Sequence, residues 1–365
     1  DAIGNATMEK YDQFGRVVSL YELDNNNRST VSQMQYNRIN GLLEKQVDAN
    51  EQATIYAYDL FGQLTSVKNA LGETTTYHYD QLGQHIKTTY PDGKATSKDY
   101  DQAGRLIKNV DALGAAEKFY YDKNGNKIKL IDKRKQQFTY AYDNRNRLLS
   151  KQGPSEEIAY RYFNDGSRAS MTDTTGTTSY QYDPYTGDLT SMTFADGKTM
   201  AYTYNKLGQR VKLKTPFDDE IGYSYTSVNQ LQQLTWNSIV EADYKYYLNG
   251  QARKEEQRNG VNVERTYDQF KLATLQYENE ATTLGQHYQY DYDLIGNITN
   301  RQATKQSIVM EDNTFTYDAL SRIATSTLFD ESYTYDKRGN RQTLSTEATP
   351  LDSLNVTMPT MNGIV

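Results

Sequence analysis

Tyr79-Asp80-Gln81-Leu82-Gly83 is one of five related stretches that recur every 21 residues between residues 56 and 150. Each stretch begins with a tyrosine and an aspartate, and four of the five have a glycine three positions after the aspartate. A fixed period of this length indicates tandem copies of one supersecondary unit. The sequence therefore predicts a structural repeat motif made of these residues: Tyr58, Asp59 and Gly62; Tyr79, Asp80 and Gly83; Tyr100, Asp101 and Gly104; Tyr121, Asp122 and Gly125; Tyr142 and Asp143.

One repeat has the composition of a β-hairpin. Residues 74–79 and 84–90 are rich in β-branched and aromatic residues, which favour strands. Between them, Asp80 can accept a hydrogen bond from the amide two residues on, and Gly83 supplies the positive φ that ends a type I turn with a bulge. Pro91-Asp92-Gly93 then predicts a second turn. A repeat is therefore two short strands and two tight turns, with no room for a helix.

Tyrosines also recur two residues apart, as in Tyr77 and Tyr79 or Tyr140 and Tyr142. This spacing places both rings on one face of a strand. We expect neighbouring repeats to stack ring beside ring as cross-strand pairs, each contributing roughly 0.2–1 kcal/mol. Such a ladder would fix the register, because a slip of one residue sends every ring to the other face.

The composition limits the classes of protein that fit. Of 365 residues only 36% are hydrophobic, and the mean hydropathy is -0.86, yet 33 tyrosines and 10 phenylalanines argue against disorder. The net charge of -7, from 40 basic and 47 acidic residues, disfavours a nucleic-acid groove. Cysteine is absent, which excludes disulfides and thiol catalysis. No apolar run is long enough to span a membrane.

The repeats occupy nearly the whole chain. We predict an array over residues 1–344, with about sixteen units of roughly 21 residues, and a non-repeat tail over residues 345–365. Because the chain starts inside the repeat pattern, we interpret it as a fragment of a longer protein.

The predicted fold class is all-β, with tandem hairpins forming one long coiled antiparallel sheet. Two strands per unit give about thirty-two strands, and open sheets rarely exceed ~10 strands without curling. Because strand twist has a fixed hand, we expect a spiral around a hollow space. The alternative, a solenoid with a filled core, needs more Leu, Ile and Val than the sequence contains.

Residues 11 to about 344 resemble the YD-repeat, or Rhs, family. The motif is frequently followed by Arg, Gln or Asn, as in Gly15-Arg16, Gly104-Arg105, Gly125-Asn126, Gly208-Gln209 and Gly339-Asn340. The resemblance implies hairpins wound into a hollow shell that holds a toxic C-terminal domain until delivery. Composition is most similar to wall-associated protein A of Gram-positive bacteria, a contact-dependent inhibition toxin. This implies a secreted or cell-wall-associated protein.

One departure from the family pattern concerns autoproteolysis. Rhs cores usually close with an Asp-Pro-x-Gly type motif, whereas Asp183-Pro184-Tyr185-Thr186-Gly187 lies in the middle of the array and has only a partial likeness to it. We therefore expect neither the autoproteolytic centre nor the toxin domain in this chain.

The sequence predicts no catalytic, cofactor-binding or metal-binding residues. His78 and His85, with Asp80, could hold a metal or transfer protons, but surface histidines are far more common. The run Asp24-Asn25-Asn26-Asn27 partly resembles a calcium loop but lacks the glycine and the distant glutamate that such a loop needs. The repeated aspartates are better explained as turn caps, because each stands at a fixed position before a glycine.

Three functions follow, in order of preference. The first is an encapsulating scaffold whose partner is its own C-terminal toxin domain as cargo, used in contact-dependent competition. The second is a module whose tyrosine-rich faces bind cell-wall polysaccharide or a target-cell surface. The third is an enzyme such as a nuclease or glycosidase. For the preferred scaffold we expect no nucleic-acid partner and no membrane span in this chain.

Overall fold

A computed structural model describes residues 6–24, 27–279 and 285–346, and these form 32 β-strands and no helix. The first half of the array contains β1(Ala6–Tyr11), β2(Val17–Asp24), β3(Asn27–Tyr36), β4(Leu43–Asp48), β5(Ala53–Tyr58), β6(Leu64–Lys68), β7(Thr74–Tyr79), β8(His85–Thr89), β9(Ala95–Tyr100), β10(Leu106–Val110), β11(Ala116–Tyr121), β12(Lys127–Ile131), β13(Gln137–Tyr142), β14(Leu148–Gln152), β15(Glu157–Tyr162) and β16(Arg168–Asp173). The second half contains β17(Gly176–Tyr182), β18(Leu189–Thr193), β19(Thr199–Tyr204), β20(Arg210–Lys214), β21(Glu220–Tyr225), β22(Leu231–Trp236), β23(Ile239–Tyr246), β24(Ala252–Gln257), β25(Val261–Asp268), β26(Lys271–Asn279), β27(Gly285–Tyr292), β28(Ile298–Lys305), β29(Ile308–Tyr317), β30(Ile323–Ser326), β31(Glu331–Tyr335) and β32(Arg341–Thr346).

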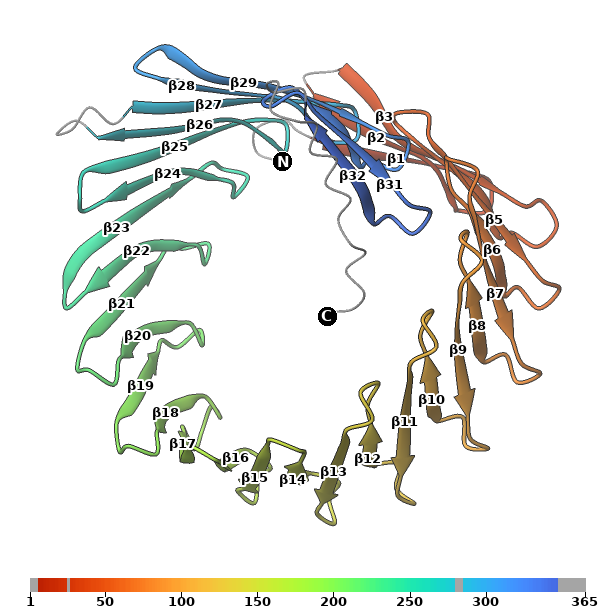
Figure 1. Ribbon diagram of the computed structural model, residues 1–365. Coiled ribbons are helices and arrows are strands. Elements are labelled where there is room, and N and C mark those ends of the chain that lie inside the picture. Colours follow the sequence, from red (N-terminus) through yellow and green to blue (C-terminus); the bar gives the residue numbers. More distant parts are fainter. Residues whose placement is uncertain (1–5, 25–26, 280–284, 347–365) are drawn as a thin grey trace. The chain divides into compact units, whose positions relative to one another are not determined.

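The chain divides into two compact units. Unit 1 comprises Asp1–Gly83, Thr88–Lys94 and Lys245–Val365, and unit 2 comprises Gln84–Lys87 and Ala95–Tyr244. Within each unit hairpin follows hairpin in sequence order (Figure 1). Unit 1 therefore brings together strands from both ends of the array, which we call the early repeats (β1–β7 with Thr88–Lys94) and the late repeats (β24–β32).

Neighbouring strands pair in antiparallel fashion with the next strand in sequence. In β5 and β6, for example, Tyr56 lies opposite Val67, and the register shifts between Ala57 and Tyr58 where the turn begins. The same shift recurs before the tyrosine of other hairpins, as between Tyr120 and Tyr121. The prediction of an all-β chain of tandem antiparallel hairpins is confirmed.

The turns of this sheet form two rows, one at each end of the strands, and we call these rows its two edges. One edge carries the turns that join an odd-numbered strand to the next even-numbered strand, and these contain the Tyr-Asp motif. The other carries the turns that join an even-numbered strand to the next odd-numbered one. In an antiparallel meander successive turns alternate between edges, so we name these the tyrosine-turn edge and the connecting-turn edge.

The two faces of the sheet alternate between half-buried and exposed residues. In β7, Tyr77 and Tyr79 are half-buried and His78 between them is exposed, as expected for rings on one face. Among the apolar residues that the structure describes, only Ala242 and Val263 are buried. Neither unit therefore packs an aliphatic layer of the thickness found between the sheets of a sandwich.

The expected ring-on-ring ladder is wrong at the positions where the register is described. Tyr56 lies opposite Val67, Tyr160 opposite Met171, and Tyr202 opposite Leu213. The reason is that strands bearing tyrosine pairs alternate with strands bearing aliphatic residues. Among the residues that the structure describes, rings meet edge to face in the T-shaped pairs Phe163–Tyr182, Tyr247–Tyr267 and Tyr277–Tyr288, whose centroids are 6.3, 6.0 and 6.3 Å apart.

The last described strand, β32, ends at Thr346. The rest of the tail that the sequence predicts over residues 345–365 lies outside the described residues. In the part of the chain that the structure covers, no helix could cross a membrane.

Candidate functional site: the repeat turns and the seam between early and late repeats

The motif aspartates cap their own turns. Oδ1 of Asp59 accepts hydrogen bonds from the amides of Phe61 and Gln63, both at 2.9 Å. The amide of Gly62 donates to the carbonyl of Asp59 at 3.2 Å, and Gly62 has a φ of 82°. The equivalent bonds to Asp80, Asp101, Asp122 and Asp143 are 2.8–3.0 Å long, as in the Leu82–Asp80, Ala103–Asp101, Asn124–Asp122, Arg145–Asp143 and Arg105–Asp101 pairs.

The motif tyrosines join one repeat to the one before it. The hydroxyl of Tyr142 donates a 3.0 Å hydrogen bond to the carbonyl of Lys127, at the start of β12. The hydroxyls of Tyr79, Tyr100 and Tyr121 likewise donate to the carbonyls of Leu64, His85 and Leu106 at 2.9, 3.0 and 2.8 Å. Each ring thus spans two strands and ends on a main-chain acceptor. Burial raises the pKa of Tyr142, and the nearby Tyr140 and Asp122 add to the effect.

An arginine four residues after the motif aspartate ties three parts of two repeats together. In the turn after β9, Nε of Arg105 donates to Oδ2 of Asp101 at 2.7 Å. Its other arm donates to the carbonyl of Asp122 at 2.9 Å, and the guanidinium lies 5.0 Å from the centroid of Tyr121. We call this arrangement the arginine staple. It recurs at the residue sets Asp12–Arg16–Tyr36, Asp143–Arg147–Tyr162 and Asp318–Arg322–Tyr335.

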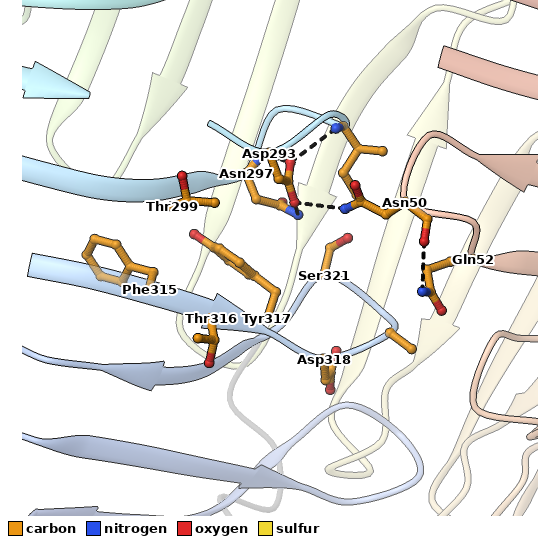
Figure 2. A pocket seen from close by; sticks show the side chains of 12 residues that line it. Asn50, Gln52, Asp293, Asn297, Thr299, Phe315, Thr316, Tyr317, Asp318 and Ser321 are labelled. Carbon is orange, nitrogen blue, oxygen red and sulfur yellow. Dashed lines mark hydrogen bonds between the residues drawn. The ribbon is translucent and has the colours of Figure 1, made fainter. Parts of the chain in front are cut away.

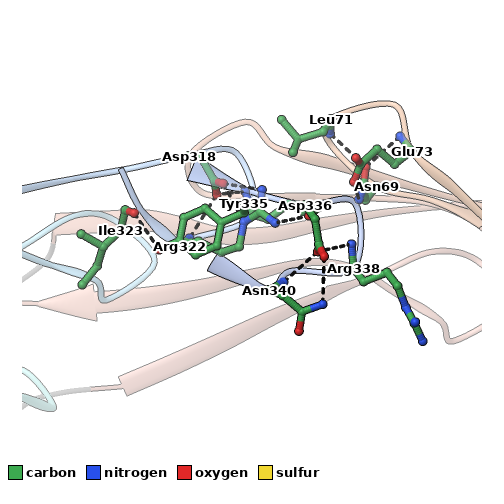
Figure 3. Close-up of polar contacts among 11 residues, drawn as sticks. Asn69, Leu71, Glu73, Asp318, Arg322, Ile323, Tyr335, Asp336, Arg338 and Asn340 are labelled. Atoms are coloured by element: carbon green, nitrogen blue, oxygen red, sulfur yellow. Dashed lines mark hydrogen bonds and ion pairs between the residues drawn. The ribbon is translucent and has the colours of Figure 1, made fainter. Parts of the chain in front are cut away.

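Figure 3 shows the last of these staples in the late repeats. Nε of Arg322 donates to Oδ2 of Asp318 at 2.7 Å, and the hydroxyl of Tyr335 donates to the carbonyl of Ile323 at 2.8 Å. The guanidinium also donates to the carbonyl of Asp336 at 3.4 Å. Such a planar fork suits arginine and not lysine, because it serves two acceptors and one ring at once.

The staple holds its aspartate in the ionised form. The hydrogen bond from Arg105 lowers the pKa of Asp101 below its ordinary value, and the amides of the turn add to the effect. At Asp143 the amide and side chain of Arg147 lower the pKa in the same way. These carboxylates are already bonded to their own turns, so their chemistry here is structural.

A seam joins the early and late repeats within unit 1. Nδ2 of Asn50, in the turn between β4 and β5, donates to Oδ2 of Asp293 at 2.9 Å, across 243 residues of sequence. Asn297 donates to the same oxygen at 2.8 Å. Figure 2 shows the two amides converging on Asp293. Burial alone would raise the pKa of Asp293, but these hydrogen bonds lower it below its ordinary value.

A second contact crosses the same seam further along. The guanidinium of Arg338, in the turn between β31 and β32, lies 4.7 Å from the centroid of the Tyr90 ring. Its Nε is 3.8 Å from Oδ2 of Asp92, with the two side chains 26% and 23% exposed. Arg338 and Asp92 are separated by nearly the same length of chain as Asn50 and Asp293. The late tyrosine-turn edge therefore meets the early connecting-turn edge at two points with nearly the same offset.

A small polar cavity of about 260 Å³, partly open to solvent, lies at the seam. Its walls combine Asn50 and Gln52 from the early repeats with Asp293, Asn297 and Ser321 from the late ones (Figure 2). Both carboxylates at this cavity, Asp293 and Asp318, already accept hydrogen bonds from their own turns. The arrangement is suited to holding two stretches of chain together.

The histidines form no metal centre that the structure describes. His78 is exposed on β7, and Nε2 of His85 lies 3.1 Å from the carbonyl of Lys87. Among the described residues, no three His, Cys, Asp or Glu side chains lie close enough together to hold a metal ion.

Residues 58–95 match the family model described as RHS Repeat. This match supports the YD/Rhs repeat family. The Rhs-type fold is also found in solved structures: 96% of this chain aligns with 26% of a chain in the crystal structure of TcdB2-TccC3, with a TM-score of 0.58 and 16% identity. A chain of the Photorhabdus luminescens Tc holotoxin pore with mutation TccC3-D651A aligns with 93% of this one, over 25% of its own length, with the same TM-score and identity. The chain thus spans about a quarter of these structures, and a search of curated proteins finds no match.

Two features of this repeat array were missed in the sequence. The staple has a sequence signal, the arginine directly after the motif glycine in Gly15-Arg16 and Gly104-Arg105, but the carbonyl and ring that it reaches lie in the next repeat. The seam has no such signal, because Asn50 belongs to an ordinary Asp-Ala-Asn-Glu turn.

Proposed function

We propose that the chain forms part of the wall of a container that isolates an effector polypeptide, and that it acts as a scaffold and not as a catalyst. The observation that carries this proposal is the seam, where Asn50 bonds Asp293 across 243 residues. A hairpin array whose late repeats are fastened to its early ones has the connectivity that an enclosing wall needs.

The composition of the sheet supports the same proposal. A sheet that is stable without a partner normally buries aliphatic side chains on one face. Here only Ala242 and Val263 are buried among the described apolar residues. Its tyrosine rings are half-buried and its other face is polar, as in β7 and β13. One face is therefore available to a polypeptide that it covers while the other faces water.

The comparisons support a toxin-associated, extracellular setting for such a scaffold. The finer proposal is that the cargo is the protein's own C-terminal toxin domain, delivered in contact-dependent competition by a secreted or cell-wall-associated protein. We also propose that this chain is related to the wall-associated protein A of Gram-positive bacteria. The experiment is co-culture of a strain carrying the gene with one lacking it, with fractionation of the producing cells. Equal survival of both strains, or retention of the protein in the cytoplasm, would contradict the finer proposal.

The container itself can be tested on the purified chain. A flexible reporter peptide with a protease site is fused after Val365, and its rate of cleavage is compared with that of the same peptide on an unrelated carrier. We expect slower cleavage in the fusion, and faster cleavage when Asn50→Ala and Arg338→Ala open the seam. Circular dichroism establishes that the variant keeps its strands. Equal cleavage in all three proteins would overturn the enclosure.

A second proposal is recognition of cell-wall polysaccharide or a target-cell surface by exposed rings. It is favoured by Tyr185, whose side chain is 95% exposed at the tip of the turn between β17 and β18. Aromatic faces of this kind can stack on sugars. Binding to isolated cell walls should then fall for Tyr185→Ala and remain for the half-buried Tyr182→Phe. Equal binding by both variants would count against it.

A further inference from the structure

The seam is held differently from the junctions between neighbouring hairpins in unit 1. Those junctions are backbone ladders: β27 and β28, for example, pair continuously from Gln286 opposite Lys305 to Tyr292 opposite Ile298. Among the described strands, none of the early repeats pairs with one of the late repeats. The late repeats are therefore joined to the early ones by side chains that reach from turn to turn, and not by a ladder.

Within the described ranges, polar side-chain contacts close the seam at two points. At the first, Nδ2 of Asn50 donates to Oδ2 of Asp293 at 2.9 Å. At the second, the guanidinium of Arg338 lies 4.7 Å from the centroid of Tyr90, and its Nε is 3.8 Å from Oδ2 of Asp92. Breaking these contacts leaves every backbone hydrogen bond of the hairpins in place.

Spaces that are partly open to solvent border the first of these contacts. The cavity of about 260 Å³ and a second hollow of about 310 Å³ share Asp293 as a wall. The second hollow lies between Val31 of the early repeats and Tyr292 of the late repeats. The buried apolar residues Ala242 and Val263 line neither space. Water can therefore replace the hydrogen bonds of the seam as it separates, and separation exposes little buried apolar surface.

The turns on both sides of the seam are fixed by their own hydrogen bonds. The amide of Asn50 donates to Oδ1 of Asp48 at 2.9 Å. The amide of Arg338 donates to Oδ1 of Asp336 at 2.8 Å, as Figure 3 shows. Each turn also continues into paired strands, so a seam residue moves only with its hairpin. The weakest contacts of a fold open first, in cooperative units that coincide with such motifs.

We propose that the seam is a joint along which unit 1 opens, with the two points of contact separating together while the hairpins on both sides stay folded. Asn50 with Asp293 and Arg338 with Asp92 form its clasp. Opening of the joint does not depend on what the array encloses. Its use as an exit for an enclosed polypeptide rests on the proposed function.

Distances between two spin labels, measured by double electron–electron resonance, test the joint. Because the chain has no cysteine, Ile55→Cys with Leu294→Cys places one label on each side of the seam, at residues that are 46% and 61% exposed. In urea too dilute to change the circular dichroism, a second and longer distance should grow beside the native one. The control pair is Ile55→Cys with Ile39→Cys, both in the early repeats, and it should keep one distance over the same range.

A substitution at the far end of the clasp tests whether the two points open together. Arg338→Ala should raise the ratio of open to closed molecules at the Ile55–Leu294 pair by roughly three- to tenfold, because it removes a cation–π contact and an ion pair. Arg147→Ala is the matched control: it removes a staple between neighbouring hairpins in unit 2 and should leave that ratio unchanged. An Arg338→Ala variant with the natural ratio would overturn concerted opening.

The same urea series separates the joint from the container. Labels that part only when the circular dichroism falls, or a control pair that parts at the same urea concentration as the seam pair, would overturn the joint even if the fused reporter peptide is protected. A seam that opens early in a protein whose reporter is cleaved as fast as on the unrelated carrier supports the joint and overturns the enclosure.

Discussion

The guanidinium of Arg147 lies 4.7 Å from the centroid of the Tyr162 ring, in the following repeat. Its Nε donates to Oδ2 of Asp143 at 2.6 Å, and another arm donates to the carbonyl of Phe163 at 3.1 Å. A single side chain thus joins a turn cap, the next motif ring and the next turn. With few buried aliphatic residues, this array relies on such polar links between repeats.

Replacing Arg147 should therefore destabilise the array more than a surface charge normally does. We expect Arg147→Ala to cost about 1–2 kcal/mol, because it removes a charge-assisted hydrogen bond and a cation–π contact together. Arg147→Lys should lose most of the same amount, because lysine lacks the planar fork. Urea unfolding measures both. Arg134→Ala, at an exposed turn position, is the control and should stay within roughly 0.5 kcal/mol. Equal midpoints for Arg147→Ala and Arg134→Ala would contradict the staple.

The hydroxyl of Tyr142 should contribute to stability apart from its ring. Tyr142→Phe removes only the hydrogen bond to the carbonyl of Lys127, and we expect a loss of about 1 kcal/mol. Tyr140→Phe in the same strand is the matched comparison, since the ring of Tyr140 contacts the ammonium of Lys127 through its face, 4.9 Å from the centroid. That variant should unfold near the natural midpoint. If the two variants unfold alike, the hydroxyl link is not what stabilises the repeat.

The turn glycines should tolerate asparagine better than alanine. Gly125 has a φ of 88°, and a Cβ added there would meet no atom within 4 Å, so Gly125→Ala tests backbone strain alone. We expect a cost of roughly 1–2 kcal/mol for alanine and less for asparagine, which occupies the equivalent place as Asn146 with a φ of 61°. Gly285→Ala, where φ is not positive and space is open, is the control for thermal melting. A larger loss for asparagine than for alanine would be inconsistent with this reasoning.

Stability should be confined to a window of pH. Hydrogen bonds from Arg105 and from the turn lower the pKa of Asp101, so its contribution is present above its unfolded pKa of about 3.9 and is lost as pH falls through the folded pKa. Burial raises the pKa of Tyr142, and burial with a hydrogen bond to Glu331 raises that of Tyr333 to about 12. Their contributions are complete below the unfolded value of about 10 and are lost as pH rises through the folded values.

Urea midpoints from about pH 2 to 12 measure this window. We expect a plateau between about pH 4 and 10, with a fall on both sides. Asp101→Asn should reduce the plateau and flatten part of the acid limb. An acid limb that is unchanged by this variant would show that other groups cause the acid unfolding.

The seam should bring distant residues within reach of a short crosslinker. Asn50 and Asn297 both donate to Oδ2 of Asp293, at 2.9 and 2.8 Å. Because the natural chain has no cysteine, Asn50→Cys with Asn297→Cys creates a single reactive pair. A short bismaleimide should link the two within one chain, as seen by peptide mass spectrometry. Each single variant is the control, and exclusively intermolecular links in the double variant would contradict the seam.

Much of this architecture follows from sequence because it is local. Asp59 and Gly62 lie within one turn. The hydrogen bonds to Asp59 come from residues at most four positions away, and the positive φ of Gly62 is a property of the same turn. Hairpin after hairpin therefore follows from spacing and turn chemistry. The hydrogen-bond partners of the motif tyrosines could not be predicted from the sequence. A spacing of two residues puts both rings on one face of a strand, but it does not identify the residues on the neighbouring strand. The strands between carry aliphatic residues, so the hydroxyls bond to carbonyls instead.

The sequence by itself determined the repeat, its turns and the antiparallel pairing, since each depends on contacts within one or two hairpins. Tertiary structure alone decided that Asn50 meets Asp293 and that Arg338 meets Tyr90 and Asp92. Small twists between strands add up over many hairpins, and no short stretch of sequence records their sum. The place where late repeats meet early ones depends on that sum.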